Sequence, residues 1–379
     1  MTYDDLRALV PAPGKGTDWQ QCRELLPGLL RLEETPQDPY YHAEGNVGIH
    51  TRMVLDALMQ DAHYLGAGVD GRFVLFMACL LHDIAKPDTT VIDEASGRIG
   101  QPGHSRRGSV DVRVLMWKAR VPFALREAVC RIIAVHQLPF HAFASRKGVR
   151  PEWLVHKLSW ELSLPDLCCV ARCDMLGRHY EKRADSMADI ALFEELAREE
   201  GCWEGPRQMA DAHTRLAYFR GADTSPDYPL FQAAGSQVTV MCGLPASGKN
   251  HWVAQHRKGW PVVSFDDARA ELGLKHGEND GLAAHHAVDQ AKALLRKQER
   301  FVWNATHLSQ QMRTKTLDLL WAYHARIELV YLEVPHPELM RRNRERDTTL
   351  SNAGIERMLH RWELPAPVEA HETVYDVQN

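Results

Sequence analysis

Residues 243–250 combine glycine, lysine and polar residues at the spacing of a phosphate-binding loop. They read Gly-Leu-Pro-Ala-Ser-Gly-Lys-Asn and follow a short β-rich run, Gln237–Cys242. Gly243 and Gly248 allow a tight turn in which successive backbone N–H groups point inward at an anion. A helix after the loop adds its positive N-terminal end, and Lys249 adds a cation for the β- and γ-phosphates. The residues expected to bind the phosphates of ATP, or of another nucleoside triphosphate, are Gly243, Ser247, Gly248, Lys249 and Asn250.

The last position of the loop departs from the usual pattern. A Ser or Thr hydroxyl normally ligates Mg²⁺ there, whereas this chain has Asn250. Because an amide oxygen can also face a hydrated Mg²⁺, the sequence still predicts that the loop binds a nucleoside triphosphate together with Mg²⁺.

Charged residues follow the next expected strand, in the run Ser264-Phe-Asp-Asp-Ala-Arg269. A carboxylate at the end of a strand could accept a proton from an attacking hydroxyl, and Arg269 could hold a neighbouring phosphate. The alternative is that Asp266 or Asp267 only caps the helix that follows.

Two further groups are expected at the same edge. The run Trp303-Asn-Ala-Thr-His-Leu308 forms a polar turn after a strand. In Met340–Arg346, Arg342 and Arg346 stand four positions apart and share one side of a helix. They could close over the phosphates as a lid, which would stabilise the charge of a transferring phosphoryl group. The alternative is an ordinary solvated helix face.

The first half of the chain carries a spaced series of metal-ligand residue types. Its most informative member is the pair His82-Asp83, which ends a helix expected to be buried, Phe73–Leu81. Two ionisable groups there need partners, and a divalent Mn²⁺, Fe²⁺, Co²⁺, Ni²⁺ or Zn²⁺ ion would satisfy both. A single histidine at a helix end is more often a cap or a surface group, so the ordered series carries the argument. Its members are His50, His82, Asp83, His104, His136 and Asp174, whereas His63, His141, His156 and His179 are interpreted as structural.

The hydrophobic pattern divides the chain into two domains. It is helical from Val47 to about Phe219, which predicts an all-α domain. Strand and helix patterns alternate after Ser236, which predicts an α/β domain with a parallel sheet. The predicted parts are a domain over 1–221, a linker over 222–236 and a domain over 237–379; strands are expected at 261–265, 300–304 and 326–334, and helices at 251–257, 268–274, 282–296 and 311–325.

Composition narrows the class of protein. A length of 379 residues favours two domains, and a net charge of −5 argues against a nonspecific DNA-coating protein. The acidic start predicts no signal peptide, and the longest apolar run, Phe73–Leu81, is too short to cross a membrane. Cys168, Cys169 and Cys173 lack a partner CxxC pair, so no zinc site is expected there. We therefore expect a cytoplasmic protein with reduced thiols.

The series His50, His82-Asp83 and Asp174 resembles the signature of HD-domain metal-dependent phosphohydrolases. Cys79–Pro87 is close to the central motif of that family, and the residues around His104 and His136 most resemble the HD domain attached to bacterial tRNA CCA-adding enzymes. The resemblance implies hydrolysis of a phosphomonoester or a cyclic phosphodiester, with Lys86 helping to neutralise the phosphate. It also implies one metal on His50, His82, Asp83 and Asp174, and a second on His104 and His136.

Residues 237–347 resemble the kinase domain of phage-type polynucleotide 5′-kinases. That resemblance implies that Asp266 is the general base for a 5′-hydroxyl and that Arg269 binds the adjacent phosphate. It also assigns the ATP phosphates to Lys249 and to the lid residues Arg342 and Arg346. His307 stands where Asn is expected in that family, which leaves its role open.

The order of the two parts resembles bacterial HD-domain/polynucleotide-kinase end-healing enzymes over nearly the full length. This implies phosphorylation of 5′-hydroxyl ends and removal of a 2′,3′-cyclic phosphate or 2′-phosphate from RNA, with DNA ends and an RNA ligase partner left open. The alternatives are a small-molecule kinase fused to a nucleotide phosphohydrolase, and a regulator that binds ATP only as a ligand. Arg269 argues against the first, and Asp266 against the second.

Overall fold

The computed structural model describes residues 1–144, 149–275, 278–345 and 350–378, and it divides into two compact units, Met1–Arg207 and Gln208–Asn379. This division comes earlier than the linker expected at 222–236. Helix α13 (Ala212–Phe219) therefore belongs to the second unit, where the Arg215 side chain donates hydrogen bonds to the carbonyls of Ala370 and His371.

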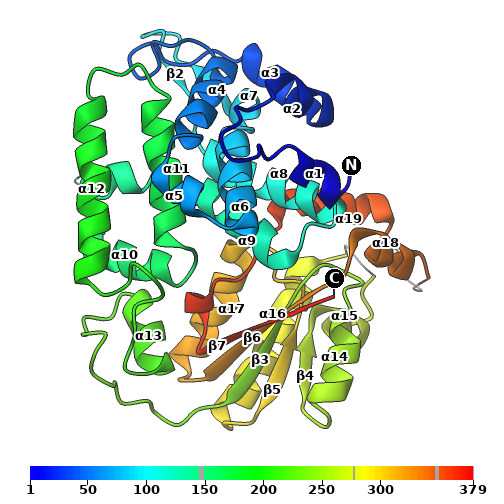
Figure 1. Cartoon of the computed structure of the whole chain (residues 1–379). Coiled ribbons are helices and arrows are strands. Elements are labelled where there is room, and N and C mark those ends of the chain that lie inside the picture. Colours follow the sequence, from blue (N-terminus) through cyan, green and yellow to red (C-terminus); the bar gives the residue numbers. More distant parts are fainter. Residues whose placement is uncertain (145–148, 276–277, 346–349, 379) are drawn as a thin grey trace. The chain divides into compact units, whose positions relative to one another are not determined.

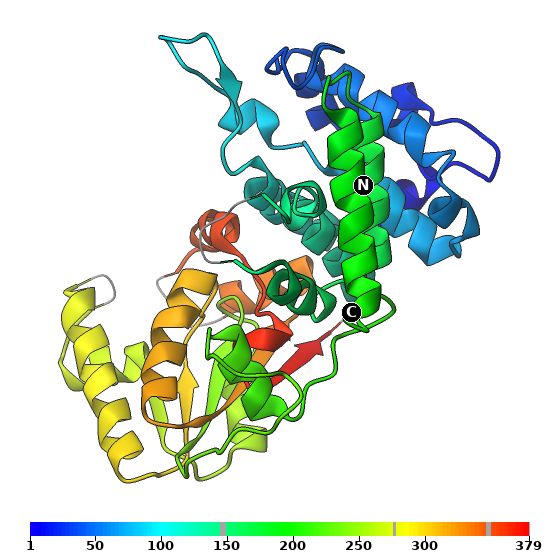
Figure 2. The same cartoon turned by 90° about the vertical axis from the view of Figure 1, so that its left-hand side faces the viewer.

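The first unit is helical, as the sequence predicted (Figure 1). One short antiparallel hairpin, β1 (Val91–Ile92) with β2 (Ile99–Gly100), interrupts the helices and extends away from them in Figure 2. The helices of this unit are α1 (Tyr3–Ala8), α2 (Trp19–Leu25), α3 (Leu30–Glu33), α4 (Val47–Leu58), α5 (Ala62–Gly66), α6 (Val69–Leu81), α7 (Lys86–Thr89), α8 (His104–Lys118), α9 (Phe123–Val135), α10 (Pro151–Ser159), α11 (Leu164–Leu176) and α12 (Arg183–Glu199), with 3₁₀ turns η1 (Pro27–Leu29) and η2 (Pro139–His141).

Helix α6 forms the centre of this unit. Every residue from Phe73 to Leu81 is buried, which confirms the prediction of a helix that is apolar on all sides. Helices α4, α9 and α11 pack against it. Because a helix enclosed in this way offers no polar face, only its ends can present functional groups, and His82 follows directly at the C-terminal end.

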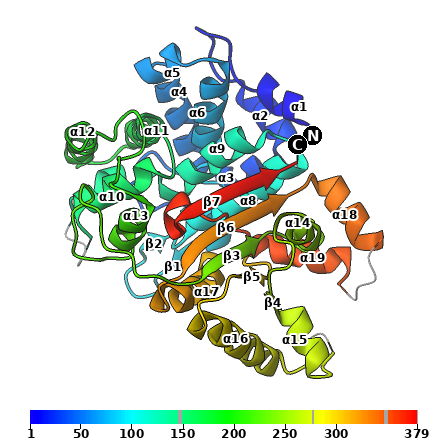
Figure 3. The same cartoon turned by 90° about the horizontal axis from the view of Figure 1, so that it is seen from below.

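The second unit is an α/β domain with a parallel sheet in the order β4-β5-β3-β6-β7 (Figures 1 and 3). Helix α16 packs against β4 and α17 packs against β6. The elements after α13 are β3 (Gln237–Cys242), α14 (Lys249–His256), β4 (Val262–Ser264), α15 (Phe265–Glu271), α16 (Asp280–Arg296), β5 (Phe301–Asn304), α17 (Gln310–Ala322), β6 (Arg326–Glu333), α18 (His336–Glu345), α19 (Asn352–Met358), η3 (Leu359–Arg361), η4 (Pro367–Glu369) and β7 (Glu372–Val377).

The strand register brings functional residues to one edge of the sheet. Met241 of β3 lies beside Asn304 of β5, which in turn lies beside Ser264 of β4. The chain leaves central strand β3 toward β4 and β5 on one side and later adds β6 on the other, so β3 stands at the point where the strand order reverses. Ligands of open α/β sheets bind at this point, beyond the carboxyl ends of the strands.

Strand β7 is an element that the sequence analysis did not predict. It pairs in parallel with β6, from Glu328 beside Glu372 to Glu333 beside Val377. Among the described residues, no helix is both long and apolar enough to cross a membrane.

Candidate metal centre and phosphate loop

The first unit brings all six predicted metal ligands together from five helices. His50 lies in the first turn of α4, and His82-Asp83 follows the C-terminal end of α6. His104 begins α8, His136 follows α9, and Asp174 lies in α11. All six side chains are buried.

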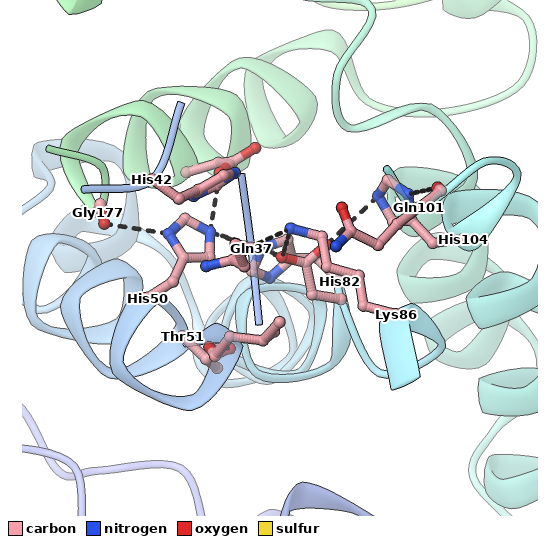
Figure 4. Close-up of polar contacts among 12 residues, drawn as sticks. Gln37, His42, His50, Thr51, His82, Lys86, Gln101, His104 and Gly177 are labelled. Carbon is pink, nitrogen blue, oxygen red and sulfur yellow. Dashed lines mark hydrogen bonds and ion pairs between the residues drawn. The ribbon is translucent and has the colours of Figure 1, made fainter. Parts of the chain in front are cut away.

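The ligand atoms of these residues lie at short distances from one another, and Figure 4 shows three of the residues, His50, His82 and His104, with their polar contacts. His50 Nε2 lies 3.1 Å from Asp174 Oδ1 and 3.3 Å from His82 Nε2. Asp83 Oδ2 lies 3.0 Å from His82 Nε2. Asp83 Oδ1 lies 3.4 Å from His104 Nε2, so this carboxylate stands between two groups of histidines.

Each of the four histidines has its Nδ1 atom placed to donate a hydrogen bond to a backbone carbonyl. That bond fixes the ring and leaves the Nε2 lone pair directed into the centre, which is the arrangement found in metal-ligating histidines. The pairs are His50 with Gly177 at 3.0 Å, His82 with Cys79 at 2.8 Å, His104 with Gln101 at 2.8 Å and His136 with Ile133 at 2.8 Å.

The residues fit divalent cations because imidazole nitrogens and carboxylate oxygens converge, with Lys86 and Arg178 as the cationic partners of Asp83 and Asp174. The Nε2 atoms of His50 and His82 are 3.3 Å apart, and in neutral rings protonated at Nδ1 both would carry lone pairs. Burial would lower the pKa of His50, but its bonds with Asp174 and Glu44 outweigh burial and raise that pKa. Among the described residues, Asp83 Oδ1 and His136 Nε2 are buried without a hydrogen bond.

Four groups among the described residues could hold a metal ion, with all ligand atoms of a group within 4.8 Å of one another. Two of them consist of predicted ligands, His50, His82 and Asp174, and His82, Asp83 and His136; the others are His42, Glu44 and His50, and Asp61, Cys169 and Cys173. His104 faces Asp83 but stands outside these groups.

Burial and nearby charges set the protonation of the centre. Burial lowers the pKa of His136 to about 3, so its imidazole stays neutral, as a metal ligand must be. Burial alone would raise the pKa of Asp83, but His82 and Lys86 outweigh it and hold that pKa well below its ordinary value. Lys86 contributes directly, since its Nζ lies 2.8 Å from Asp83 Oδ2.

Residues around the ligands were missed by the sequence analysis. Glu44 Oε1 lies 2.7 Å from His42 Nδ1 and 3.3 Å from His50 Nδ1. Lys86 Nζ donates to Gln37 Oε1 at 2.7 Å. These partners come from the loop before α4, which has no periodicity to mark them. Arg178, by contrast, pairs with Asp174 four positions earlier, a spacing that could have revealed it.

The phosphate loop has the predicted strand, turn and helix around it. Gly243 and Gly248 have left-handed backbones, with φ of 136° and 104°. A Cβ atom on Gly243 would lie 2.4 Å from the carbonyl oxygen of Leu332, so no larger residue fits. Lys249 begins α14, and its Nζ donates to the carbonyls of Gly243 and Leu244 at 2.9 and 2.8 Å.

Polar groups at the loop are suited to an anion and its cation. The hydroxyl of Ser247 is buried without a hydrogen bond. Asn304 Nδ2 donates to Asn250 Oδ1 at 2.8 Å, which directs the donor groups of the Asn250 amide away from Asn304. A Cβ atom on Gly248 would lie 3.5 Å from Nη1 of Arg342, so this arginine reaches the loop. The second predicted lid residue, Arg346, lies outside the described residues.

The two adjacent aspartates after β4 have different roles. The N-cap of α15 is Ser264, whose hydroxyl accepts from the Asp267 N–H at 3.0 Å and donates to the Asp267 carboxylate at 2.6 Å. Asp267 therefore belongs to the cap. Asp266 stands outside the cap with 86% of its side chain exposed, and its Oδ1 lies 2.8 Å from Arg269 Nη1. Asp266 is therefore an exposed carboxylate beside an arginine, and it is accessible to a ligand from solvent.

His307 is buried beneath the loop and has a structural role. Its Nδ1 is 2.8 Å from the Met241 carbonyl, its Nε2 is 3.0 Å from the Thr316 hydroxyl, and its φ is 45°. Burial lowers its pKa to about 4. A neutral ring in this position links strand β3 to helix α17.

Comparison with known proteins gives matches of two kinds. A family model described as an AAA domain matches residues 238–365. Over 199 residues the chain is 30% identical to the multifunctional CCA protein of Laribacter hongkongensis, which covers 50% of this chain and 45% of that protein. The corresponding protein of Halorhodospira halophila is 35% identical over 124 residues, which are 33% of this chain and 27% of that protein. That of Polaromonas naphthalenivorans is 38% identical over 159 residues, which are 41% of this chain and 34% of that protein.

The chain thus spans less than half the length of these curated relatives. Its P-loop domain implies binding of a nucleotide and Mg²⁺. The chain combines this P-loop domain with homology to multifunctional CCA proteins and a helical unit in which His and Asp residues could hold metal ions.

Proposed function

We propose that the chain is a bifunctional enzyme that repairs nucleic-acid ends. One site phosphorylates a 5′-hydroxyl with ATP, and the other removes a 2′,3′-cyclic phosphate, a 2′-phosphate or a 3′-phosphate. The observation that carries the proposal is that one chain holds both a buried centre of converging acceptor atoms and a phosphate loop with an acid–arginine pair at the same sheet edge.

In the helical unit, His50, His82, Asp83 and Asp174 would hold one divalent cation. His104 and His136 would hold a second, with Asp83 between the two. Such cations supply Lewis acidity toward a phosphoryl group and its attacking water. Lys86 Nζ lies 2.8 Å from Asp83 Oδ2 and donates to Gln37, and its ammonium group would offset the charge of the substrate phosphate.

In the P-loop domain, Asp266 would accept the proton of the 5′-hydroxyl while Arg269 holds the neighbouring phosphate. A bond forms between the 5′-oxygen and the γ-phosphorus, and the bond from that phosphorus to ADP breaks. Lys249 and Arg342 would stabilise the charge on the phosphates during transfer. Both lie at the loop, Lys249 through two carbonyl bonds and Arg342 beside Gly248.

The test uses one oligoribonucleotide that carries a 5′-hydroxyl and a 2′,3′-cyclic phosphate. It is incubated with the full chain, ATP, Mg²⁺ and Mn²⁺, and both ends are resolved on a gel. We expect Lys249→Ala to lose only 5′-phosphorylation and Asp83→Ala to lose only 3′-end hydrolysis. If the wild-type chain alters neither end, the proposed function is wrong.

A second candidate is a small-molecule kinase fused to a nucleotide phosphohydrolase. It is favoured by the ion pairs of Arg269 with both Asp266 and Asp280, because an arginine engaged in this way need not bind substrate. Phosphorylation of a free nucleoside but not of the oligonucleotide, with no effect of Arg269→Ala on the nucleoside reaction, would support this candidate instead.

A further inference from the structure

A pocket of about 500 Å³ lies between the β1–β2 hairpin and the loop before α4. This volume lies within the range of small-molecule binding sites. The hairpin is the segment that extends from the helices in Figure 2. Residues that line the pocket include Asp38, Tyr41, Val91, Ile92, Arg98 and Gly100.

Three residues that line the pocket are sequence neighbours of residues that contact groups of the metal centre. Asp38 follows Gln37, the partner of Lys86, and Tyr41 precedes His42, whose ring is 4.9 Å from that of His50. Gly100 precedes Gln101, whose carbonyl accepts from His104 Nδ1 at 2.8 Å. Neighbouring Cα atoms are about 3.8 Å apart, so at these three points the lining of the pocket is one residue away from a residue that contacts Lys86, His50 or His104.

Tyr41 offers an aromatic surface to this pocket. Its ring packs edge-on against Tyr40, with centroids 4.8 Å apart, and at a tilt of 45° against Tyr180, with centroids 5.4 Å apart. The two neighbouring rings hold its orientation, yet Tyr41 remains 39% exposed and Tyr40 46% exposed. A rigid and accessible ring of this kind suits stacking of a nucleobase.

Apolar and charged groups complete the pocket. Val91 and Ile92 on the hairpin are more than half exposed, so apolar surface faces the pocket from a second element. The carboxylates in the lining hold turns: Asp38 accepts from the Tyr40 N–H at 3.0 Å, and Asp93 from the Ser96 N–H at 2.7 Å. Arg98 has no ion pair among the described residues and supplies a positive charge.

We propose that this pocket binds the terminal nucleoside of a nucleic-acid 3′ end, with the base stacked on Tyr41 and in contact with Val91 and Ile92. Arg98 then binds the phosphodiester on the 5′ side of that nucleoside. The inference rests on the proposed hydrolase function of the metal centre. It makes the enzyme selective for nucleotides over other phosphate esters.

The test compares two substrates with the same reactive ring. One is a ribonucleoside 2′,3′-cyclic phosphate, and the other is methyl ribofuranoside 2′,3′-cyclic phosphate, which lacks the base. We expect kcat/KM to favour the nucleoside by about tenfold or more, the range of a stacked base. Tyr41→Ala removes this preference, Tyr41→Phe keeps it, and Tyr228→Ala, an exposed tyrosine of the other unit, leaves both reactions unchanged.

A dinucleotide substrate tests the charged part of the pocket. Arg98→Ala is expected to lower kcat/KM about tenfold for a dinucleotide that ends in a 2′,3′-cyclic phosphate and to leave the mononucleoside value unchanged. Equal losses on both substrates would remove Arg98 from the proposal.

Two results would overturn the proposal as a whole. One is a wild-type enzyme that hydrolyses the baseless substrate as well as the nucleoside. The other is a Tyr41→Ala variant that loses both reactions equally, which would make Tyr41 a support for His42. If the wild type hydrolyses neither substrate, the proposed function fails separately. In that case the equilibrium affinities for a ribonucleoside 3′-monophosphate and for ribose 3-phosphate are compared. Tighter binding of the nucleotide that is lost in Tyr41→Ala supports the proposed pocket. Equal affinities for the two compounds refute it.

Discussion

At the scale of single residues, we expect substitutions of the neighbours Asp266 and Asp267 to have different effects. Asp266 is exposed and paired with Arg269, whereas Asp267 is bonded to the Ser264 cap. We expect Asp266→Asn to lower kcat for 5′-phosphorylation about 100-fold or more, the usual contribution of a general base, without weakening ATP binding. Steady-state kinetics with a 5′-hydroxyl oligonucleotide give kcat, and nucleotide titration gives the affinity.

Asp267→Asn is the matched control for that experiment. It removes the same charge one position away and weakens a cap, so stability should fall by about 1 kcal/mol while kcat changes little. A larger loss of kcat in Asp267→Asn than in Asp266→Asn would show that Asp266 is not the general base.

His307 predicts how the P-loop domain responds to acid. Its pKa in the folded chain is about 4, below the ordinary 6.5, so the unfolded chain takes up a proton first as the pH falls. Its contribution to stability is complete above pH 6.5 and is lost between pH 6.5 and 4, by about 3 kcal/mol. Denaturant unfolding of the full chain at several pH values measures this loss.

The variant His307→Asn isolates that effect. Asparagine tolerates the left-handed backbone at this position and does not titrate. The dependence of stability on pH between 4 and 6.5 should therefore flatten in the variant. An unchanged slope would show that another group titrates on unfolding.

The sequence could single out the proposed metal ligands because several of them stand at the ends of helices with strong apolar patterns. His82 and His136 both follow such helices, α6 and α9. His42 and Glu44 could not be found in this way, since they lie in a loop whose path is set by tertiary contacts. The role of Glu44 depends on its contact with His50, and no spacing in the sequence encodes that contact.

At the scale of elements, the contact between α4 and Gly177 at the end of α11 controls the metal centre. A Cβ atom on Gly177 would lie 2.5 Å from the Val54 side chain and 2.9 Å from its backbone nitrogen. The φ of Gly177 is −74°, which alanine adopts without strain, so the substitution is unfavourable because of packing alone. Gly177→Ala should therefore displace α4 and His50 and cost about 1–3 kcal/mol.

Metal content and both activities measure that displacement. We expect less bound Mn²⁺ and slower hydrolysis in Gly177→Ala, with 5′-phosphorylation unchanged. Gly66→Ala is the control, because nothing lies within 4 Å of the added atom. Full metal content in Gly177→Ala would mean that α4 and α11 adjust without moving His50.

The elements themselves could be predicted where the residue pattern alone decides them. Helix α6 and strands β3 and β5 are encoded by largely apolar runs. Strand β7 was missed because Glu372 and Asp376 interrupt a short run that is only partly buried. Its strand conformation depends on the edge of β6, and a partner of this kind is invisible in a single sequence.

At the scale of the whole molecule, the boundary between the two units can be tested with fragments. Residues 208–379 keep α13, in which Arg215 bonds the carbonyls of Ala370 and His371 and His213 stacks on His371. A fragment of residues 222–379 lacks these contacts. We expect its melting temperature to be lower by about 2–8 °C, as a loss of about 1–2 kcal/mol implies for a domain of this size.

Calorimetry of the two fragments, with and without ADP and Mg²⁺, measures the difference. Residues 1–207, prepared alone, should retain metal binding. Equal melting temperatures for 208–379 and 222–379 would place the boundary at the later position that the sequence suggested.

The carbonyl bonds that hold the four imidazoles also determine the order of assembly. Each ring is oriented by a backbone group of the folded helices, and the surrounding apolar core is large enough to form without an ion. Folding therefore precedes loading, unlike small zinc domains that unfold when stripped of metal. A chelator should abolish the proposed hydrolase activity reversibly. It should lower the melting temperature of the helical unit and leave the helical circular dichroism unchanged. Re-addition of metal should restore the activity without a refolding step.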